Sequence, residues 1–205
     1  MPSVLSEADR QRLLDGDDDR FYEQPRFVQH VDEPFRERLT ALYRDRLSPQ
    51  DDVLDLMSSW VSHLPSDLEL GEVVGHGLNE TELDRNDRLD RWFRRNLNDD
   101  QTLPLESASV DAVLCAVSVQ YLQYPGRVFA EVARTLRPGG VVIVSFSNRM
   151  FAQKAIRAWR SRSMDERAAL VAEYLDSTGA FGAPSVHSTV ERGQDPFYAV
   201  TGVKR

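Results

Sequence analysis

The stretch Val53-Leu54-Asp55-Leu56-Met57-Ser58-Ser59-Trp60 decides the fold. An apolar run leads into the acid Asp55, and small polar residues follow it. This order is typical of nucleotide-binding α/β proteins, in which a buried strand ends near an acid and a tight turn follows. The glycines usual in such a turn are missing here. We therefore expect a buried strand over residues 53–57 and place Asp55 at its functional end.

Strand and helix signals alternate along the rest of the chain. Apolar runs predict strands at residues 70–76, 92–97, 110–117 and 141–146, and a hairpin of residues 185–190 and 197–203 at the end. Apolar residues at helical spacing predict helices that begin at Glu33 and at Pro125. The alternation predicts an α/β fold with a doubly wound, mostly parallel sheet that is covered on both faces and ends in an antiparallel hairpin.

Capping signals refine the helices. Ser6 is expected to cap a short helix that runs towards Leu14, and Asn79 with Glu82 and Ser163 with Glu166 resemble capping boxes. Residues 150–162 are predicted to form a basic helix. The basic side chains of residues 149–162 are expected to form a solvated face; in the alternative interpretation they attract an anionic substrate or a partner. The segment 137–140 is expected to stop the preceding helix and turn the chain.

Composition limits the class of protein. The chain has 205 residues and a formal net charge of −8, so one domain with a substantial core is expected and a broad nucleic-acid footprint is disfavoured. The single cysteine, Cys115, excludes an internal disulfide, fits a reducing compartment and is expected to be a small buried strand residue. No apolar run approaches the roughly 20 residues that cross a bilayer, and no signal peptide is visible. These features predict a soluble, cytoplasmic protein with no membrane partner.

Four parts of the sequence carry a family resemblance. They are Asp55, Leu103-Pro104, Val110-Asp111-Ala112-Val113 and Glu131-Val132-Ala133-Arg134-Thr135-Leu136-Arg137-Pro138-Gly139-Gly140. Over residues 50–147 the chain resembles the class I S-adenosylmethionine-dependent methyltransferases, and within them the type 11 group. The resemblance implies a seven-stranded sheet of order 3-2-1-4-5-7-6. It also implies two parts, a helical extension or lid over residues 1–48 and a methyltransferase-like Rossmann domain over residues 49–205.

The same resemblance implies S-adenosylmethionine as cofactor. In the family, a glycine-rich loop follows the first strand, where this chain has Met57-Ser58-Ser59. An acid that binds the ribose normally ends the second strand, where Gly77 stands, and Asn79 is expected to supply a weaker bond in its place. Asn96 or Asp99 corresponds to the acid beside the adenine. The cofactor-binding residues implied in this way are Asp55, Met57, Ser58, Ser59, Gly77, Leu78, Asn79, Asn96, Leu97 and Ala116.

Methyl transfer asks little of catalytic side chains. The nucleophile must lie in line with the methyl group in a water-poor pocket, and a base is needed only when the acceptor arrives protonated. Tyr22 and His30 are candidates to bind or deprotonate the substrate, although a lone His or Tyr more often has a structural role. No cluster of His, Asp and Glu has metal-ligand spacing, so no metal is expected.

The segment after the fourth strand bears on the acceptor. Ser118, Gln120 and Tyr121 are expected either to face a small molecule or to satisfy local backbone groups. The Asn/Asp-Pro-Pro-Tyr/Phe sequence of methyltransferases that act on amino groups is absent there, which favours a small-molecule acceptor over a nucleic-acid base or a protein amide. Trp60 is expected to pack in the core.

Two other functions stay open. The altered loop and Gly77 are also compatible with a catalytically inactive methyltransferase-like protein that serves as a binding or regulatory module. A dinucleotide-dependent oxidoreductase is disfavoured because no Gly-x-Gly-x-x-Gly follows the first strand and the second strand lacks its acid.

Overall fold

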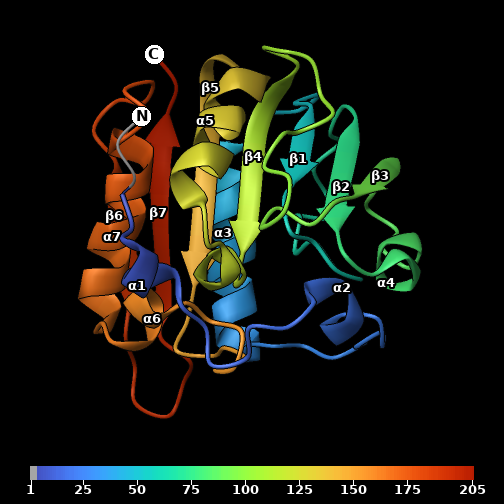
Figure 1. Ribbon diagram of the computed structural model, residues 1–205. Coiled ribbons are helices and arrows are strands. Elements are labelled where there is room, and N and C mark those ends of the chain that lie inside the picture. Colours follow the sequence, from blue (N-terminus) through green and yellow to red (C-terminus); the bar gives the residue numbers. More distant parts are fainter. Residues whose placement is uncertain (1–3) are drawn as a thin grey trace.

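The computed structural model describes residues 4–205, which form a seven-stranded sheet with helices on both faces (Figure 1). The strand order is β3-β2-β1-β4-β5-β7-β6, which confirms the order that the resemblance implied. Strands β3, β2, β1, β4 and β5 are parallel, whereas β7 is antiparallel to β5 and β6. The strands are β1 (Val53–Asp55), β2 (Val73–Gly77), β3 (Arg91–Arg94), β4 (Val110–Ala116), β5 (Leu136–Phe146), β6 (Ser185–Thr189) and β7 (Phe197–Val203).

The helices are mostly short. Ser6 and Asn79 accept hydrogen bonds from the first turns of α1 and α4, as their sequences predicted, and Ser163 with Glu166 forms the predicted capping box of α7. The helices are α1 (Glu7–Arg10), α2 (Asp18–Phe21), α3 (Glu33–Arg46), α4 (Glu80–Asp84), α5 (Pro125–Thr135), α6 (Arg157–Arg160) and α7 (Met164–Asp176), with a 3₁₀ turn η1 (Val119–Tyr121).

Two hydrophobic cores lie on opposite faces of the sheet. Successive side chains of a strand point to opposite faces, so Leu54 packs with α5 and α7, whereas its neighbour Val53 packs with α3. The apolar stripe predicted for α3 is confirmed, because Phe35, Leu39 and Tyr43 are fully buried against the sheet. The helix α3 thus shares a core with the sheet, and the division of the chain into residues 1–48 and 49–205 stays a prediction.

The connection between β1 and β2 contains no helix. Residues 56–72 form turns and extended segments, and three of their leucines, Leu64, Leu68 and Leu70, pack into the α3 core. Parallel strands are usually joined through a crossover helix. Its absence here lets residues 57–62, called the β1 loop below, run across the carboxyl end of β2, where the Ser58 N–H donates to the His76 carbonyl at 2.6 Å.

In the N-terminal segment, residues 4–32, α1 lies beside α6, and α2 lies below the end to which β4 points (Figure 1). A buried ionic cluster holds it there. The Asp18 carboxylate accepts hydrogen bonds from Arg12, from Lys154 after β5, and from Asn98 after β3. Since Asp18 and Lys154 are almost wholly buried, this cluster joins the N-terminal segment firmly to the sheet edge.

The predicted basic helix over residues 150–162 is wrong. Only residues 157–160 are helical, as α6, because the backbone of this segment bonds to other parts of the chain. Phe151 N–H donates to the Tyr121 hydroxyl, and Arg157 N–H donates to the Gln11 carbonyl. Lys154 points inward and is 1% exposed, whereas Arg149 and Arg157 are exposed, so the predicted solvated basic face is present only in part.

Smaller predictions also need correction. The first helix ends at Arg10, well before Leu14. Strand β5 begins at Leu136, so the turn predicted at 137–140 already pairs with neighbouring backbone. Trp60 is only half-buried, at the rim of the cavity described below, and is not a core residue. Cys115 is fully buried in β4 as expected.

The Glu131–Gly140 segment has a structural role. Arg134 binds the Glu131 carboxylate and the carbonyls of Leu103 and Leu105, and Arg137 forms ion pairs with Asp52 and Asp111. These contacts join α5, β1 and β4 on the side opposite the strands' carboxyl ends, as expected for a fold signature.

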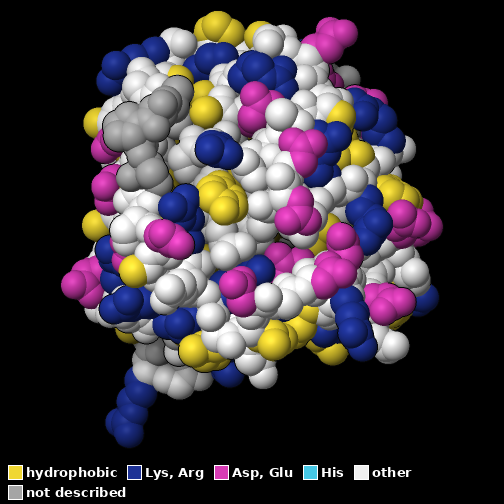
Figure 2. Space-filling model, viewed as in Figure 1, with side chains coloured by type: hydrophobic (Ala, Val, Ile, Leu, Met, Phe, Trp, Pro, Cys, Tyr) yellow, Lys and Arg dark blue, Asp and Glu magenta, His cyan; other side chains and the backbone are white. Residues whose placement is uncertain are grey.

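The surface carries charges of both signs. On the face drawn in Figure 2, Lys and Arg side chains are interspersed with Asp and Glu, and no broad basic area is visible on this side. Within residues 4–205, none of the helices has the length and apolar character that a bilayer span requires.

Candidate functional site

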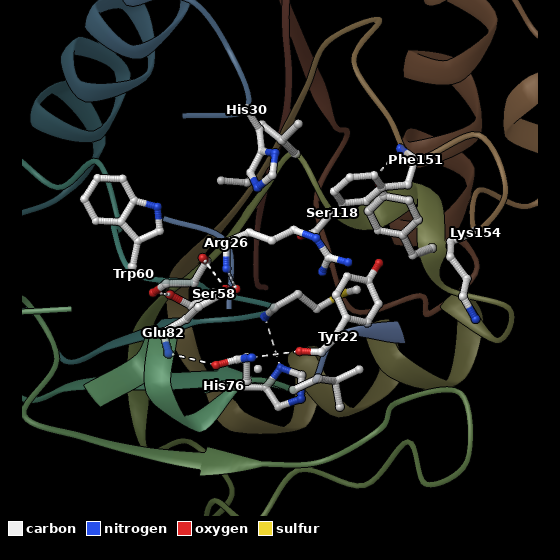
Figure 3. A pocket seen from close by; sticks show the side chains of 18 of the residues that line it. Tyr22, Arg26, His30, Ser58, Trp60, His76, Glu82, Ser118, Phe151 and Lys154 are labelled. Atoms are coloured by element: carbon white, nitrogen blue, oxygen red, sulfur yellow. Dashed lines mark hydrogen bonds between the residues drawn. The ribbon is translucent and has the colours of Figure 1, made fainter. Parts of the chain in front are cut away.

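A cavity of about 360 Å³ opens at the carboxyl ends of β1, β2 and β4, beneath the N-terminal segment (Figure 3). Its size lies within the range of small-ligand sites, and its place is the crevice where doubly wound sheets bind ligands. The structure brings together at this cavity twelve of the candidate residues named from the sequence: Tyr22, His30, Asp55, Met57, Ser58, Ser59, Gly77, Leu78, Asn79, Asn96, Leu97 and Ala116.

Asp55 is the buried carboxylate of the cavity. It is 3% exposed, and its Oδ2 accepts hydrogen bonds from Ser58 Oγ at 2.6 Å and from Ser62 Oγ at 2.5 Å. Its Oδ1 has no hydrogen-bond partner among residues 4–205. Burial raises the pKa of Asp55 to about 6, although the two hydroxyl donors oppose this rise. At neutral pH the site therefore holds a carboxylate with one oxygen free for a positively charged ligand group.

The β1 loop is fixed by His76. Met57 N–H donates to Nδ1 of His76 at 3.0 Å, and Nε2 lies 2.8 Å from the Arg95 carbonyl, which requires the neutral ring with its proton on Nε2. Burial lowers the pKa of His76 to about 4, in keeping with that neutral form. His76 therefore ties the β1 loop and β2 to the chain after β3. The sequence gives no sign of this role.

Met57 takes the place of a glycine in backbone conformation as well as in sequence. Its φ is 58°, in the left-handed region that glycine adopts freely and other residues adopt at a cost of about 1–3 kcal/mol. The bond from Met57 N–H to His76 helps to hold this conformation. The β1 loop thus keeps a glycine-like turn without containing a glycine.

Gly77 and the β1 loop depend on each other. A Cβ added at Gly77 would lie 2.8 Å from the Ser58 carbonyl oxygen and 3.3 Å from the Leu83 side chain. Both distances are tighter than ordinary carbon contacts. The backbone of the β1 loop thus occupies the space that a side chain at position 77 would need. The β1 loop without glycines and the glycine at the end of β2 are therefore one structural feature.

Asn79 is engaged by the protein itself. Its Oδ1 accepts from the Glu82 N–H, and its Nδ2 donates to the carbonyls of Tyr22 and Glu23. The expected bond from Asn79 to a ribose would have to replace one of these contacts. In this structure Asn79 caps α4 and ties the N-terminal segment to β2.

Glu82 is a second acid of the cavity that sequence reasoning missed. It does not complete a capping box with Asn79. Instead it accepts hydrogen bonds from Ser59 Oγ at 2.6 Å and from the Arg26 N–H at 2.6 Å. Nothing in its sequence context distinguishes it from a solvent-facing helix residue, because both contacts come from segments distant along the chain.

The ends of β3 and β4 form the remaining floor. Asn96 lines the cavity and bonds to Asp99 at 2.7 Å, whereas Asp99 itself lies outside the lining. Ser118 and Tyr121 line the cavity after β4, but Gln120 is buried beside it and bonds to the Val117 carbonyl. Of the two interpretations of Gln120, the structure supports the local backbone role.

Aromatic rings cover the cavity on the side of the N-terminal segment. Tyr22 lies edge-on to Tyr121 and Phe151, and His30 lies edge-on to Phe151 with ring centroids 5.6 Å apart. The Tyr22 hydroxyl is buried without a hydrogen-bond partner in the described chain. Burial raises the pKa of Tyr22 and lowers the pKa of His30. At neutral pH Tyr22 is therefore a hydrogen-bond donor, and His30 is a neutral imidazole able to accept a proton.

No metal centre is apparent. Within residues 4–205 no group of three or more His, Cys, Asp or Glu side chains is arranged to hold a metal ion. The polar groups of the cavity are instead carboxylates, hydroxyls, amides and cationic side chains, which suit a polar organic ligand.

Comparisons with known proteins agree with this geometry. Residues 60–144 match the family model described as "Methyltransferase domain". No curated protein matches the chain significantly.

Many solved structures share the fold. An S-adenosylmethionine-dependent methyltransferase from Aquifex aeolicus has a TM-score of 0.57 at 15% identity, covering 91% of this chain and 97% of that one. Phosphoethanolamine N-methyltransferase 2 from Haemonchus contortus, in complex with S-adenosyl-L-methionine, has a TM-score of 0.60 at 13% identity, covering 83% and 52%. The [4+2]-cyclase SpnF has a TM-score of 0.61 at 16% identity, covering 82% and 81%. At these identities the structural matches establish the fold alone, whereas the family model matches the sequence itself. Together they support the resemblance read from the sequence: residues 60–144 match a methyltransferase domain, and the chain has the class I S-adenosylmethionine-dependent methyltransferase fold.

Proposed function

We propose that the protein binds S-adenosylmethionine in this cavity and transfers its methyl group to a small molecule. The observation that carries the proposal is the free Oδ1 of Asp55, which belongs to a carboxylate that is 3% exposed and lines a cavity of ligand size at the carboxyl edge of the sheet. Burying such a group without a partner is unfavourable, and the ammonium group of the cofactor's methionine part would satisfy it. When bound, S-adenosylmethionine supplies a methyl group made electrophilic by the sulfonium.

Each end of the cavity fits a different part of this cofactor. The backbone of Met57, Ser58 and Ser59 would contact the methionine part, because the glycine-like turn brings it to the cavity wall. Gly77, Leu78, Asn79, Asn96 and Leu97 would surround the adenosine, and Ala116 would lie beside the reacting centre. In this assignment Asn79 mainly supports the wall and the N-terminal segment, since its amide already has three partners.

Two side chains of the N-terminal segment are assigned to the acceptor. Tyr22 would donate a hydrogen bond from its unpartnered hydroxyl, because its raised pKa keeps the proton in place. His30 would take the proton from an acceptor that arrives protonated, because its lowered pKa leaves the ring neutral. The rings of Tyr121 and Phe151 shield the Tyr22 hydroxyl from water, whereas His30 lies exposed at the rim of the cavity.

A non-catalytic binding protein is the second candidate. Two observations favour it: the β1–β2 connection lacks the usual helix, and the Arg26 side chain extends across the cavity (Figure 3). One protein of the same fold, SpnF, is described as a [4+2]-cyclase, so the fold by itself does not fix the chemistry.

Calorimetric titration separates the candidates. We expect S-adenosylmethionine and S-adenosylhomocysteine to bind with micromolar dissociation constants, and Asp55→Ala to weaken this binding at least about tenfold, or about 1.4 kcal/mol. Ser66→Ala, in the β1–β2 connection but outside the cavity lining, is the matched control. Transfer of a tritiated methyl group to a panel of small molecules then tests catalysis. If neither S-adenosylmethionine nor S-adenosylhomocysteine binds, the enzymatic proposal is rejected.

A further inference from the structure

We propose that Arg26 makes the acceptor site selective for small molecules that carry a carboxylate. The inference rests on the proposed function, because it takes the β1, β2 and β3 side of the cavity as the cofactor's. It concerns the other side, where the N-terminal segment faces the chain after β4 and β5.

Arg26 differs from the other cations of the cavity in its partners. Arg95 pairs with Asp100, Arg149 pairs with Asp195, and Lys154 pairs with Asp18. Among the described residues, the Arg26 guanidinium makes no ion pair, and its only hydrogen bond goes from Nη2 to the Phe21 carbonyl at 2.9 Å. Its charge is therefore the one cationic charge of the lining, within residues 4–205, that no protein carboxylate neutralises.

Aromatic rings hold this guanidinium in place. Its central carbon lies 4.9 Å from the ring centroid of Phe21, 5.7 Å from that of Tyr22 and 5.3 Å from that of Phe151. Rings stabilise a guanidinium through its flat faces, and its N–H groups point outward in the plane. Nε and Nη1 have no partner in the described chain. Arg26 therefore offers several free donors in the fork geometry that binds a carboxylate through two parallel hydrogen bonds.

The position of the guanidinium assigns this carboxylate to the acceptor. The Arg26 backbone lies on the Glu82 side, where its N–H bonds to that acid, and its side chain reaches across to Ser118 and Phe151 (Figure 3). Ser118 follows β4, which lies between β1 and β5 in the sheet, and Phe151 follows β5, so the guanidinium lies on the β4 and β5 side of the cavity. A fixed positive charge there repels the cofactor's sulfonium. An acceptor that brings its own negative charge would offset this repulsion and would be drawn to the place of transfer.

The test compares carboxylates with neutral compounds of the same shape. Benzoate with benzamide, 4-hydroxybenzoate with 4-hydroxybenzamide, and hexanoate with hexanamide are titrated calorimetrically into the full chain, with and without saturating S-adenosylhomocysteine. We expect at least one carboxylate to bind ten times more tightly than its amide. Arg26→Gln should abolish this preference, and Arg26→Lys should retain part of it, because lysine keeps the charge but loses the fork. Arg149→Gln is the matched control, and it should retain the preference because the charge of Arg149 is already paired.

The outcomes separate this inference from the function on which it rests. If S-adenosylhomocysteine binds the wild-type chain and Arg26→Gln equally while the carboxylate preference disappears in the variant, the inference is supported. If no pair shows a preference in the wild-type chain, it is overturned, and the proposed function stands. If Arg26→Gln instead loses S-adenosylhomocysteine, Arg26 serves the carboxylate of the cofactor, which also overturns the inference. If the wild-type chain binds no S-adenosylhomocysteine, the proposed function fails, whereas titrations without it still measure the preference.

Discussion

Replacing Asp55 with Asn is expected to stabilise the fold while it weakens the site. Burial raises the pKa of Asp55 from its usual value of 3.8 to about 6. Because a tenfold change in an ionisation equilibrium corresponds to about 1.36 kcal/mol, keeping Asp55 ionised in the folded chain costs roughly 3 kcal/mol at neutral pH. Asn has no charge, and its oxygen can still accept from the hydroxyls of Ser58 and Ser62. Asp55→Asn should therefore raise the free energy of unfolding at pH 7.5 by about 1–3 kcal/mol.

The effect has a defined dependence on pH. As pH falls through 6, Asp55 takes up a proton in the folded wild-type chain, whereas in the unfolded chain it stays ionised down to its usual 3.8. The wild-type fold gains stability relative to the variant over this window, so the advantage of Asp55→Asn should fall to about half at pH 5. Urea unfolding of both proteins at pH 7.5 and pH 5 measures it. Taking the difference between the two proteins at each pH cancels every other titrating group.

A neighbouring acid provides the matched control. Asp52, at the start of β1, accepts hydrogen bonds from the Glu72 N–H and from Arg137, and these lower its pKa. Asp52→Asn should therefore destabilise the fold, the opposite sign. If Asp55→Asn also destabilises the chain at pH 7.5, or if its advantage does not change with pH, Asp55 is not the strained carboxylate described here and the main support for the proposed cofactor site is lost.

Three further predictions follow from the same site. The affinity for S-adenosylmethionine should fall about tenfold for each pH unit below 6, because Asp55 must lose its proton to accept an ammonium group; equal calorimetric affinities at pH 7.5 and pH 5 would contradict this. Gly77→Ala should destabilise the chain by about 1–3 kcal/mol in urea and weaken cofactor binding, because its Cβ collides with the Ser58 carbonyl, whereas Gly16→Ala, with open space around it, should do neither. His76→Gln should lower the free energy of unfolding by about 1–3 kcal/mol, because it disturbs the hydrogen bond from Met57 N–H. The pKa of His76 falls from 6.5 to about 4 on folding, so the contribution of His76 to stability is complete above pH 6.5 and is lost as pH falls towards 4. A variant that unfolds like wild type at pH 7.5 would refute the role given to His76.

The fold was largely predictable because its signals are local. Apolar runs such as those in β4 and β5 bury on both sides and read as strands in any context. The basic helix over residues 150–162 failed for the opposite reason. Its spacing is helical, but its backbone groups bond to Tyr121 and to the N-terminal segment, and Lys154 is drawn into the Asp18 cluster. Such contacts between distant segments leave no periodic trace in the sequence.

The location of the candidate site could be predicted from the sequence, but the hydrogen-bond partners of its side chains could not. Residues at the carboxyl ends of strands must gather at one edge of a parallel sheet, so the candidates from Asp55 to Ala116 fell on one cavity. The partners of each side chain depend on loop paths that no local rule gives. Ser62, His76 and Glu82 were missed for this reason, because each acts on the site through a residue at least seven positions away.

The places where the fold carries unfavourable energy indicate whether the β1 loop has kept a function in ligand binding. Met57 in the left-handed region and ionised Asp55 in the interior each cost the fold on the order of 1–3 kcal/mol. Asp55 ends β1 and Met57 begins the β1 loop, and other residues help to keep both in place: His76 bonds to Met57, two serines bond to Asp55, and Gly77 leaves room for the backbone of the loop. A loop that had merely lost its glycines would relax to remove these costs. Strain that is concentrated at a cavity and supported from several segments is typical of a site built to hold a ligand, which favours binding of the cofactor over an empty scaffold.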